Sequence, residues 1–512
     1  MKVSGLLLVL LLLVLSESTQ RGEASLTEGT HYARELKQRL LYNRQSRLPE
    51  DLSLKSLTPE MDSDGLPQIP PQFMEQPLDH FDKNNNRTIQ QRFWVDNRYW
   101  EGPGSPVFLF IGGENPLSKY NVLLGSHVEL AERMGAMVVA AEHRFYGQST
   151  LPEGAADSVL PFLRVRQALA DLVGLIRALS RDLDLPEETR WVAFGGSYSG
   201  ALAAWLREKF PSLIFAAIAS SAPVRAKVDF HEFNEAVGRS LADPIVGGSK
   251  ECLRRVSEAF ATIDKMIQSD RLSELSRDFS SCVPLAADRP RDVDTLVTNL
   301  AAVFIMATTF NAEAHDASVA DVCTTMTDDS LGNSYTRLIH INKRYLIKRI
   351  PCTVNLYQGV ISELRDPQRS ELRPWFYQKC TELCFLQTCR PREGCPFSKL
   401  LSLETTAAMC TDAFGLTQQD MERGVESTNR MFGGDRPTGS RLLFVNGDVD
   451  PWRELSVVAP FRGSAVKTLT VRGGAHCSDT NPSLSRDPPA LTQARKAIGQ
   501  QLDAWLRMSR DL

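Results

Sequence analysis

This sequence has no excess of basic residues. Its 58 lysines and arginines are matched by 62 aspartates and glutamates, so the 512 residues carry a formal net charge of -4. Acidic and basic residues are mixed along the chain, and no basic stripe is available to bind a phosphate backbone. We therefore predict that nucleic acid is not a partner.

Long apolar runs are also missing beyond the N-terminus, and no internal repeat of fixed period is present. A membrane-spanning helix needs roughly 20 apolar residues, whereas the run over residues 6–15 is shorter. This run follows the basic Lys2 and precedes a polar stretch with small residues over 16–24, an order typical of a secretory signal peptide. We predict a signal peptide over residues 1–24 and no membrane span in the mature protein. An uncleaved anchor is the alternative.

Glycosylation sequons are scarce. Asn86 begins the single sequon, which lies in a polar run over residues 82–87. An exposed sequon in a secreted protein is a glycosylation acceptor. We predict that Asn86 carries a glycan, the alternative being an unmodified surface turn.

The chain divides by composition into a polar N-terminal stretch and an ordered remainder. Residues 25–71 are polar and end in glycine and prolines, which is typical of a linker or pro-segment that contributes nothing to a core. From Phe73 onward, apolar runs alternate with helical stretches, which indicates a mostly parallel sheet with helices on its faces. We expect strands over residues 107–111, 137–141, 191–194, 215–219, 442–446 and 468–472, and helices over 167–179, 201–209 and 491–508.

Cysteines are concentrated in the long interruption between the fourth and fifth of these strands. Eight of the ten lie between Cys252 and Cys395, and Cys410 follows. This region is dominated by helical stretches such as residues 253–268. Secretion favours disulfides, so we expect an inserted helical region stapled by them, with the connectivity left open. Zinc bound by four thiolates is the alternative, with the candidate ligands Cys380, Cys384, Cys389 and Cys395.

A candidate nucleophile follows the strand over residues 191–194. The chain there passes through two glycines into Ser197 and then into an alanine-rich helix. A nucleophile elbow requires small residues two before and two after the serine, and here these are Gly195 and Ser199. Ser199 is the alternative nucleophile, but the small-residue pattern favours Ser197. A glycine-rich turn without chemistry is the alternative for this segment taken alone.

The same elbow predicts an oxyanion hole. The backbone N–H of Tyr198, at the start of the helix, should point to where an oxyanion forms. A second donor comes from the loop after an earlier strand in such folds. Gly112 and Gly113 follow the strand over residues 107–111, and we take Gly113 as the candidate, although the sequence does not decide which amide donates.

The order serine, acid, histidine in α/β-hydrolases restricts the other catalytic residues. Four histidines follow Ser197: His231, His315, His340 and His476. His476 lies in a glycine-rich loop between a predicted strand and the last helix, where the general base of such folds belongs. The acid is Asp448 or Asp450, and we favour Asp450 because Pro451 extends its backbone and Trp452 can shield the pair from water. Asp448, beside Gly447, is more typical of a turn.

Five segments together resemble the serine peptidase family of prolylcarboxypeptidase and dipeptidyl peptidase II. They are QPLDHF (residues 76–81), EHRFYGQS (142–149), GGSYSG (195–200), NGDVDPW (446–452) and GGAHCSD (473–479). The resemblance covers residues 72 to 480 and implies the same assignment of Ser197, Asp450 and His476. His143 precedes the serine in the chain, so we expect structural hydrogen bonds there rather than catalysis.

The resemblance also implies a helical cap inserted in an α/β-hydrolase domain. Its segment over residues 373–383 looks like a substrate-facing motif, with Trp375, Gln378 and Glu382 as candidates. Residue patterns alone favour packing for the aromatic residues of this segment. Cys384 and Ser199 stand where the family commonly has glycine. The implied organisation is an α/β-hydrolase domain over residues 72–228 and 437–512 and a disulfide-rich cap over 229–436.

We therefore expect a serine peptidase that forms an acyl-enzyme on Ser197 and needs no cofactor and no metal. The resemblance implies exopeptidase action on short peptides near proline, in endosomal or lysosomal vesicles or outside the cell. Peptides are the expected partners, and a homodimer is compatible with the sequence. An esterase or lipase on the same scaffold and a catalytically silent binding protein are the alternatives.

Overall fold

The computed structural model describes residues 66–311, 317–347, 351–368, 370–390 and 394–508. The predicted signal peptide and all but the last six residues of the predicted linker, 66–71, lie outside these ranges. Over the described ranges, no helix combines the length and the apolar character that crossing a membrane requires.

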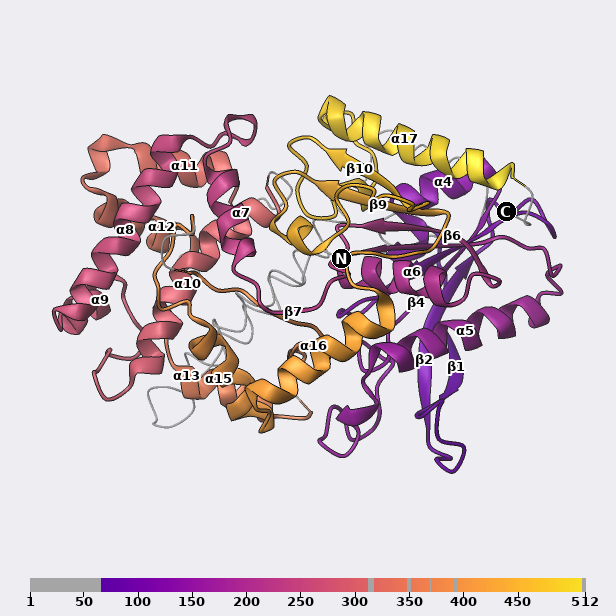
Figure 1. Cartoon of the computed structure of the whole chain (residues 1–512), viewed down its shortest axis with the longest axis horizontal. Coiled ribbons are helices and arrows are strands. Elements are labelled where there is room, and N and C mark those ends of the chain that lie inside the picture. The colour runs from indigo at the N-terminus through magenta and orange to yellow at the C-terminus, as the bar shows by residue number, and fades with distance from the viewer. Residues whose placement is uncertain (1–65, 312–316, 348–350, 369, 391–393, 509–512) are drawn as a thin grey trace.

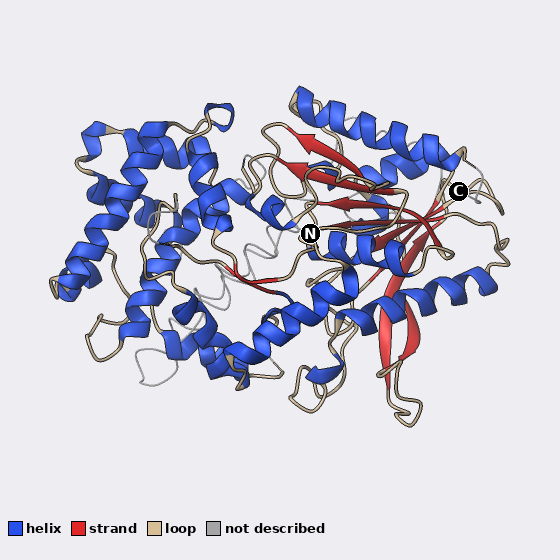
Figure 2. Cartoon of the chain, viewed as in Figure 1, coloured by secondary structure: helices blue, strands red, loops and turns tan. Residues whose placement is uncertain are grey.

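A mixed sheet forms the centre of the right-hand lobe in Figures 1 and 2. Its strand order is β1-β2-β4-β3-β5-β6-β9-β10. The pairs β1–β2 and β2–β4 are antiparallel and the other pairs are parallel. The strands are β1 (Gln72–Pro77), β2 (Thr88–Asp96), β3 (Val107–Ile111), β4 (Met137–Ala141), β5 (Trp191–Gly196), β6 (Ile214–Ser220), β9 (Leu442–Gly447) and β10 (Lys467–Val471).

The central strands bury both of their faces. In β3, Val107, Leu109 and Ile111 pack into one apolar core, while Phe108 and Phe110 pack into a second core on the other face. A parallel strand covered on both sides reads as a continuous apolar run, which is why these strands could be predicted from the sequence. Leu66 is 5% exposed and belongs to the second core. The prediction that residues 25–71 contribute nothing to a core was therefore wrong at this residue.

Helices cover the two faces of the sheet. Residues of α4 and α17 pack into the second core and residues of α5 and α6 into the first, and Figure 1 shows the two pairs on opposite sides. The helices of this lobe are α3 (Tyr120–Leu123), α4 (Ser126–Met134), α5 (Val165–Asp182), α6 (Tyr198–Lys209) and α17 (Pro489–Leu506), with short 3-10 turns at Leu160–Phe162, Pro451–Leu455 and Ser478–Thr480.

The chain between β6 and β9 forms a second, helical lobe, which we call the cap (Figure 1). A small parallel pair of strands, β7 (Lys227–Asp229) and β8 (Cys384–Leu386), lies in its connection to the first lobe. The cap helices are α7 (Glu232–Leu241), α8 (Lys250–Gln268), α9 (Leu272–Asp278), α10 (Pro290–Thr309), α11 (Val319–Thr327), α12 (Ser334–Tyr345), α13 (Tyr357–Arg365), α14 (Arg373–Gln378), α15 (Leu403–Phe414) and α16 (Gln418–Phe432), with 3-10 turns at Pro244–Val246 and Asp329–Leu331 and a π-helical turn at Lys379–Leu383.

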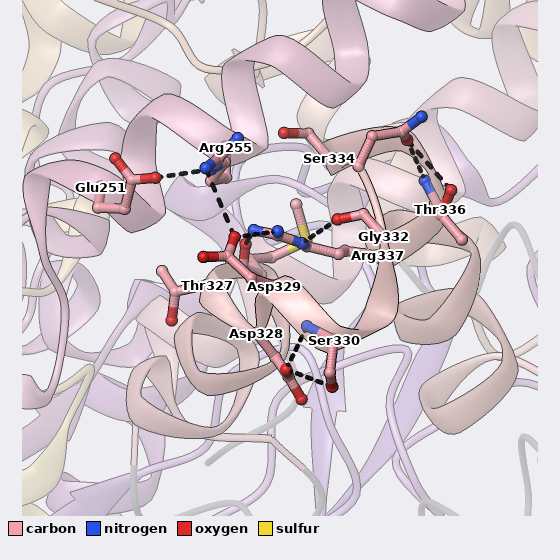
Figure 3. Close-up of polar contacts among 12 residues, drawn as sticks. Glu251, Arg255, Thr327, Asp328, Asp329, Ser330, Gly332, Ser334, Thr336 and Arg337 are labelled. Carbon is pink, nitrogen blue, oxygen red and sulfur yellow. Dashed lines mark hydrogen bonds and ion pairs between the residues drawn. The ribbon is translucent and has the colours of Figure 1, made fainter.

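Hydrogen bonds close the turn between α11 and α12 (Figure 3). The Asp328 carboxylate accepts from the backbone N–H of Ser330 at 2.9 Å. The buried guanidinium of Arg337 pairs with Asp329, and Arg255 of α8 lies 3.7 Å from the same carboxylate. The turn is thus fixed both locally and against the neighbouring helix.

Four disulfides staple the cap: Cys252–Cys323, Cys282–Cys352, Cys380–Cys410 and Cys389–Cys395. They include three of the four cysteines that a zinc site would have used, so the zinc alternative is wrong for that set. Cys384 and Cys477 are buried free thiols. The α/β-hydrolase fold with an inserted, disulfide-rich helical cap is confirmed.

Removing the longest-range disulfide should destabilise the cap more than removing the shortest. Cys252 and Cys323 are 71 residues apart, whereas Cys389 and Cys395 are 6 apart. Loop-closure entropy gives a loss of about 4 kcal/mol for the first pair and about 2 kcal/mol for the second. Denaturant unfolding of the Cys252→Ala/Cys323→Ala and Cys389→Ala/Cys395→Ala proteins measures both losses. Equal losses would show that chain entropy is not the dominant contribution.

Candidate active site

Ser197 lies at the sharp junction between β5 and α6, with φ 61° and ψ -135°. This backbone conformation is strained for a residue with a side chain. The backbone N–H of Ser197 donates to the Ser220 carbonyl at 2.9 Å, and its own carbonyl accepts from Ala201 at 3.0 Å. The junction is therefore held by the neighbouring strand and by the first turn of the helix.

The small residues around Ser197 are required by close backbone contacts. A Cβ on Gly195 would lie 2.1 Å from the carbonyl oxygen of Ser199, and one on Gly200 would lie 2.8 Å from that of Ser220. The Ser199 hydroxyl donates to the Gly196 carbonyl at 2.9 Å and accepts from its N–H at 3.1 Å. Because Ser199 serves the turn in this way, the geometry favours Ser197 over Ser199 as nucleophile.

Gly195→Ala should disrupt the elbow. The added methyl group would overlap a backbone carbonyl that cannot move without displacing α6, and overpacking of this kind costs about 3 kcal/mol or more. Gly439→Ala is the matched control, because its added Cβ would meet nothing closer than 3.8 Å. Thermal unfolding should separate the two proteins, and equal melting temperatures would contradict the proposed contact.

His476 and Asp450 form a buried pair. The Nδ1 atom of His476 lies 2.8 Å from Oδ2 of Asp450, and the two residues are 1% and 0% exposed. The other carboxylate oxygen of Asp450 accepts from the backbone N–H of Trp452 at 3.0 Å. The Trp452 ring centroid lies 6.0 Å from that of His476. The pair is thus oriented by hydrogen bonds and covered by an indole ring.

The loop that carries His476 is held from three sides. Asp448 Oδ1 accepts from the Gly473 N–H at 2.6 Å, which agrees with the turn role predicted for Asp448. The Cys477 N–H donates to the Ser221 hydroxyl at 2.9 Å. Ser221 directly follows Ser220, whose carbonyl accepts from the Ser197 N–H. From the cap, the last residue of α10, Thr309, accepts from the His476 N–H at 2.8 Å. His476, the candidate base, is therefore positioned by both lobes.

The electrostatics of His476 are set by two opposing effects. Burial, the largest single effect, lowers the pKa of the imidazole, but the adjacent Asp450 carboxylate and Cys477 together outweigh burial and raise that pKa well above its usual value. Nε2 of His476 is buried and makes no hydrogen bond within the described part of the chain. Catalytic hydrogen bonds are often long before substrate binds.

The candidate oxyanion loop follows β3. The Gly112 N–H donates to the Ala141 carbonyl at 2.8 Å, so that amide is already engaged. A Cβ built on Gly113 would lie 3.4 Å from Cβ of Ser199, which places this glycine against the elbow. Of the two glycines, Gly113 is therefore the better candidate for the second oxyanion-hole donor. The first candidate donor is the Tyr198 amide at the start of α6.

Glu114 is a residue of this loop that the sequence reasoning did not consider. It is 4% exposed, and its Oε1 atom has no hydrogen-bond partner among the residues described. Burial raises the pKa of its carboxyl to about 7, and His476 is close enough to act on it electrostatically. The sequence signal for Glu114 was a charged residue that directly follows a buried strand and two glycines.

The neighbours of His143 have the structural role predicted for them. Glu142 is fully buried and accepts hydrogen bonds from Arg92, Leu117 and Ser149. Arg144 is 1% exposed and pairs with Asp171 at 2.6 Å. These groups tie β1, β2 and α5 to the loop after β4.

The three cap candidates lie close to the elbow in different settings. Trp375 is buried with its ring centroid 5.4 Å from that of Tyr198. Gln378 is fully buried and donates to the Tyr198 hydroxyl at 2.8 Å. Glu382 is partly exposed and accepts from the Val165 N–H at 3.0 Å, and burial raises the pKa of its carboxyl to about 7.

The remaining candidates lie elsewhere. Asn86 is exposed in the turn before β2, as a glycosylation acceptor must be. His231, the residue before α7, lies 2.6 Å from the carboxylate of Glu235 on that helix. His340 lies on α12, and His315 is outside the described residues. Over the described ranges, no group of three or more histidine, cysteine or acidic side chains could hold a metal ion.

Comparison with known proteins adds relatives over most of the chain. The chain is 38% identical over 454 residues to the human thymus-specific serine protease, covering 86% of this chain and 87% of that protein. It is 27% identical over 461 residues to the bovine lysosomal Pro-X carboxypeptidase, with 85% and 87% covered.

Solved structures give weaker likenesses. A proline iminopeptidase of Mycobacterium smegmatis matches with a TM-score of 0.33 and 14% identity, over 85% of this chain and 99% of that one. A probable hydrolytic enzyme of Pseudomonas aeruginosa matches with a TM-score of 0.35 and 10% identity, over 89% and 97%. Scores at this level carry nothing about function.

The model of the family described as serine carboxypeptidase S28 matches residues 76–498, a span that contains β2 to β10, the cap, the elbow and the His476–Asp450 pair. The chain is therefore a serine-type peptidase and belongs to the serine carboxypeptidase S28 family.

Proposed function

We propose that the chain hydrolyses short peptides as an exopeptidase, with Ser197 as nucleophile, His476 as general base and Asp450 as the residue that orients the histidine. The observation that carries the assignment is the buried 2.8 Å contact between His476 and Asp450, on a loop anchored beside the serine elbow. Order and geometry of this kind are what acyl transfer requires.

The proposed reaction has two steps. Ser197 Oγ attacks the peptide carbonyl carbon while Nε2 of His476 takes its proton, and the C–N bond breaks as that proton passes to the leaving amine. Water then attacks the ester, giving a proton to His476, and the acid leaves as Ser197 regains its hydrogen. The amides of Tyr198 and Gly113 would stabilise the negative charge that forms on the carbonyl oxygen.

The substrate preference near proline is also proposed. It is supported by the name of the Pro-X carboxypeptidase relatives and by family membership. Trp375 and Glu382, which lie close to Tyr198, are the cap residues we propose to face the substrate. We place the protein in endosomal or lysosomal vesicles or outside the cell, with a glycan on Asn86.

A peptide library tests this proposal. The purified, glycosylated protein is incubated with the library at pH 5 and pH 7, and the products are read by mass spectrometry. Removal of residues from one terminus beside proline is the expected result. Internal cuts would contradict exopeptidase action. Turnover of short acyl esters without any peptide cleavage would favour an esterase, and failure to react with a fluorophosphonate would contradict the catalytic assignment.

A further inference from the structure

The side chain of Tyr198 is held between the two lobes. Tyr198 is 1% exposed and directly follows Ser197. From the cap, Gln378 donates to its hydroxyl at 2.8 Å and Trp375 packs against its ring. From the sheet lobe, Nε2 of His143 lies 3.1 Å from the same hydroxyl. The residue after the candidate nucleophile is thus a point of contact between cap and hydrolase lobe.

The hydrogen bonds around Tyr198 have a single consistent direction. Nδ1 of His143 lies 2.7 Å from the carbonyl oxygen of Arg144, which can only accept, so Nδ1 carries the hydrogen. Burial lowers the pKa of His143 to about 4, which keeps the ring neutral and leaves Nε2 as an acceptor. Tyr198 therefore donates to His143.

The chain continues into the cap. The Tyr198 oxygen accepts from Nε2 of Gln378, and Oε1 of Gln378 accepts from the Tyr146 hydroxyl at 2.6 Å. The four groups form a chain of hydrogen bonds in which Tyr146 donates to Gln378, Gln378 donates to Tyr198, and Tyr198 donates to His143. Each hydroxyl and amide atom named has a partner, and a fully satisfied buried network of this kind fixes one arrangement.

Tyr198 is placed where small displacements affect the reaction. It opens α6, and its backbone N–H is one of the two amides that the proposed mechanism directs at the developing oxyanion. Interactions that hold such a donor act on the transition state more than on substrate binding. A group that fixes the Tyr198 side chain also restricts the position of this amide.

We propose that Gln378 is a positioning residue for catalysis: it clamps Tyr198 from the cap, and the elbow reaches its reactive geometry only when α14 is seated on the hydrolase lobe. This inference rests on the proposed function. It assigns Gln378 a role through Tyr198, in place of the direct contact with substrate that the resemblance implied. Cap and catalytic centre would then be coupled at one hydrogen-bonded contact, and loosening the cap would lower turnover.

The variant Gln378→Met tests the clamp, because it keeps the length of the side chain and removes both hydrogen bonds. The matched control is Asn429→Leu. Asn429 is a half-buried cap amide on α16, and it makes two hydrogen bonds, of 2.8 and 2.9 Å, to the main chain of Ala226 rather than to the elbow. Both variants remove two hydrogen bonds made by a cap amide: Gln378 loses those to Tyr198 and Tyr146, and Asn429 loses those to Ala226 in the connection before β7. They therefore share any general effect of a weakened cap.

We expect kcat of Gln378→Met to fall by about 10- to 100-fold, since a misplacement of about 1 Å at a catalytic group can cost about 100-fold. KM should change by less than about threefold, because substrate binding is not altered. The rate of labelling by a fluorophosphonate should fall in parallel with kcat. The Asn429→Leu protein should keep the kcat of the wild type even if its melting temperature drops.

Tyr198→Phe provides a second test that removes one oxygen atom and keeps the ring. It should reduce kcat in the same way, and the double variant Tyr198→Phe/Gln378→Met should be no worse than the more affected single variant, as expected for residues acting through one contact. If Gln378→Met does not fold, the Tyr198→Phe result alone decides.

The outcomes separate the clamp from the proposed function. If the wild-type protein takes up the label and both Gln378→Met and Tyr198→Phe are labelled at the wild-type rate, the clamp is wrong and the catalytic assignment stands. If the wild-type protein takes up no label, the proposed function fails and the clamp with it. Equal losses of kcat in Gln378→Met and Asn429→Leu would reduce Gln378 to an ordinary interface residue.

Discussion

Replacing Ser197 by alanine is expected to reduce kcat for peptide hydrolysis by about a million-fold, the loss seen when a nucleophile is removed from a serine peptidase. Alanine keeps the Cβ and therefore the strained backbone at this position, with its φ of 61°, so the protein should fold as before. Product formation measured by mass spectrometry over days, with enzyme in micromolar amounts, gives the sensitivity that this loss requires.

The matched control is Ser199→Ala, which removes the hydroxyl that bonds to Gly196. Its nucleophile should still displace fluoride from a fluorophosphonate, and the resulting phosphonyl-enzyme is detected as an increase in mass. Labelling of Ser197→Ala together with loss of labelling in Ser199→Ala would move the nucleophile to Ser199 and overturn the assignment.

Position 197 also allows a test of backbone strain, read as a change in stability. Ser197→Gly should be more stable than Ser197→Ala by about 1 kcal/mol, because glycine adopts a positive φ without steric cost. Urea unfolding of the two inactive proteins makes the comparison free of any effect of turnover. A less stable glycine variant would indicate that the junction is not strained.

The second large effect is expected for Asp450→Asn. The asparagine amide can occupy the place of the carboxylate, but it favours the wrong imidazole tautomer and does not stabilise imidazolium. The kcat should therefore fall by about 10⁴-fold. Asp448→Asn is the control, because the Asp448 carboxylate accepts from the Gly473 N–H, whereas the imidazole of His476 pairs with Asp450. Similar losses in both variants would contradict the choice of Asp450.

The pH dependence of Asp450→Asn has a definite direction. The carboxylate raises the pKa of His476, so in the wild type this imidazole loses its proton only at a pH well above the usual pKa of histidine. Without the carboxylate, the largest contribution that raises this pKa is lost, so the pKa of His476 falls relative to the wild type. The rising limb of kcat/KM against pH should therefore move to lower pH in the variant, although its plateau is lower. An unchanged limb would mean that another group controls it.

The central sheet could be predicted because β3, β4, β5, β6 and β9 are buried on both faces and appear as apolar runs. The two antiparallel strands at one side of the sheet, β1 and β2, were not predicted. β2 mixes exposed residues such as Thr88 and Gln90 with buried ones such as Ile89 and Phe93, and its glutamines and arginine mask the strand signal. Pairing with β4, decided by tertiary contacts, sets its conformation.

At the site, local motifs were enough to propose Ser197, Asp450 and His476, because an elbow and a loop after a strand each leave a trace in a few consecutive residues. The contacts that join these motifs leave none. Gln378 and Tyr198 are 180 residues apart, and Tyr146 and Gln378 are 232 apart. Partners at such distances cannot be read from spacing, so the hydrogen bond between the cap glutamine and the elbow tyrosine could not be predicted.

The end of α10 has a consequence for exchanging caps between related enzymes. Thr309 binds the main chain of His476, and the Phe310 ring centroid lies 6.1 Å from the imidazole centroid. A chimera that grafts a foreign cap would replace these supports and impair the general base, even if the new cap folded and bound its own peptides. Transplants should therefore retain residues 290–310 together with α14, and draw new specificity from the remaining helices.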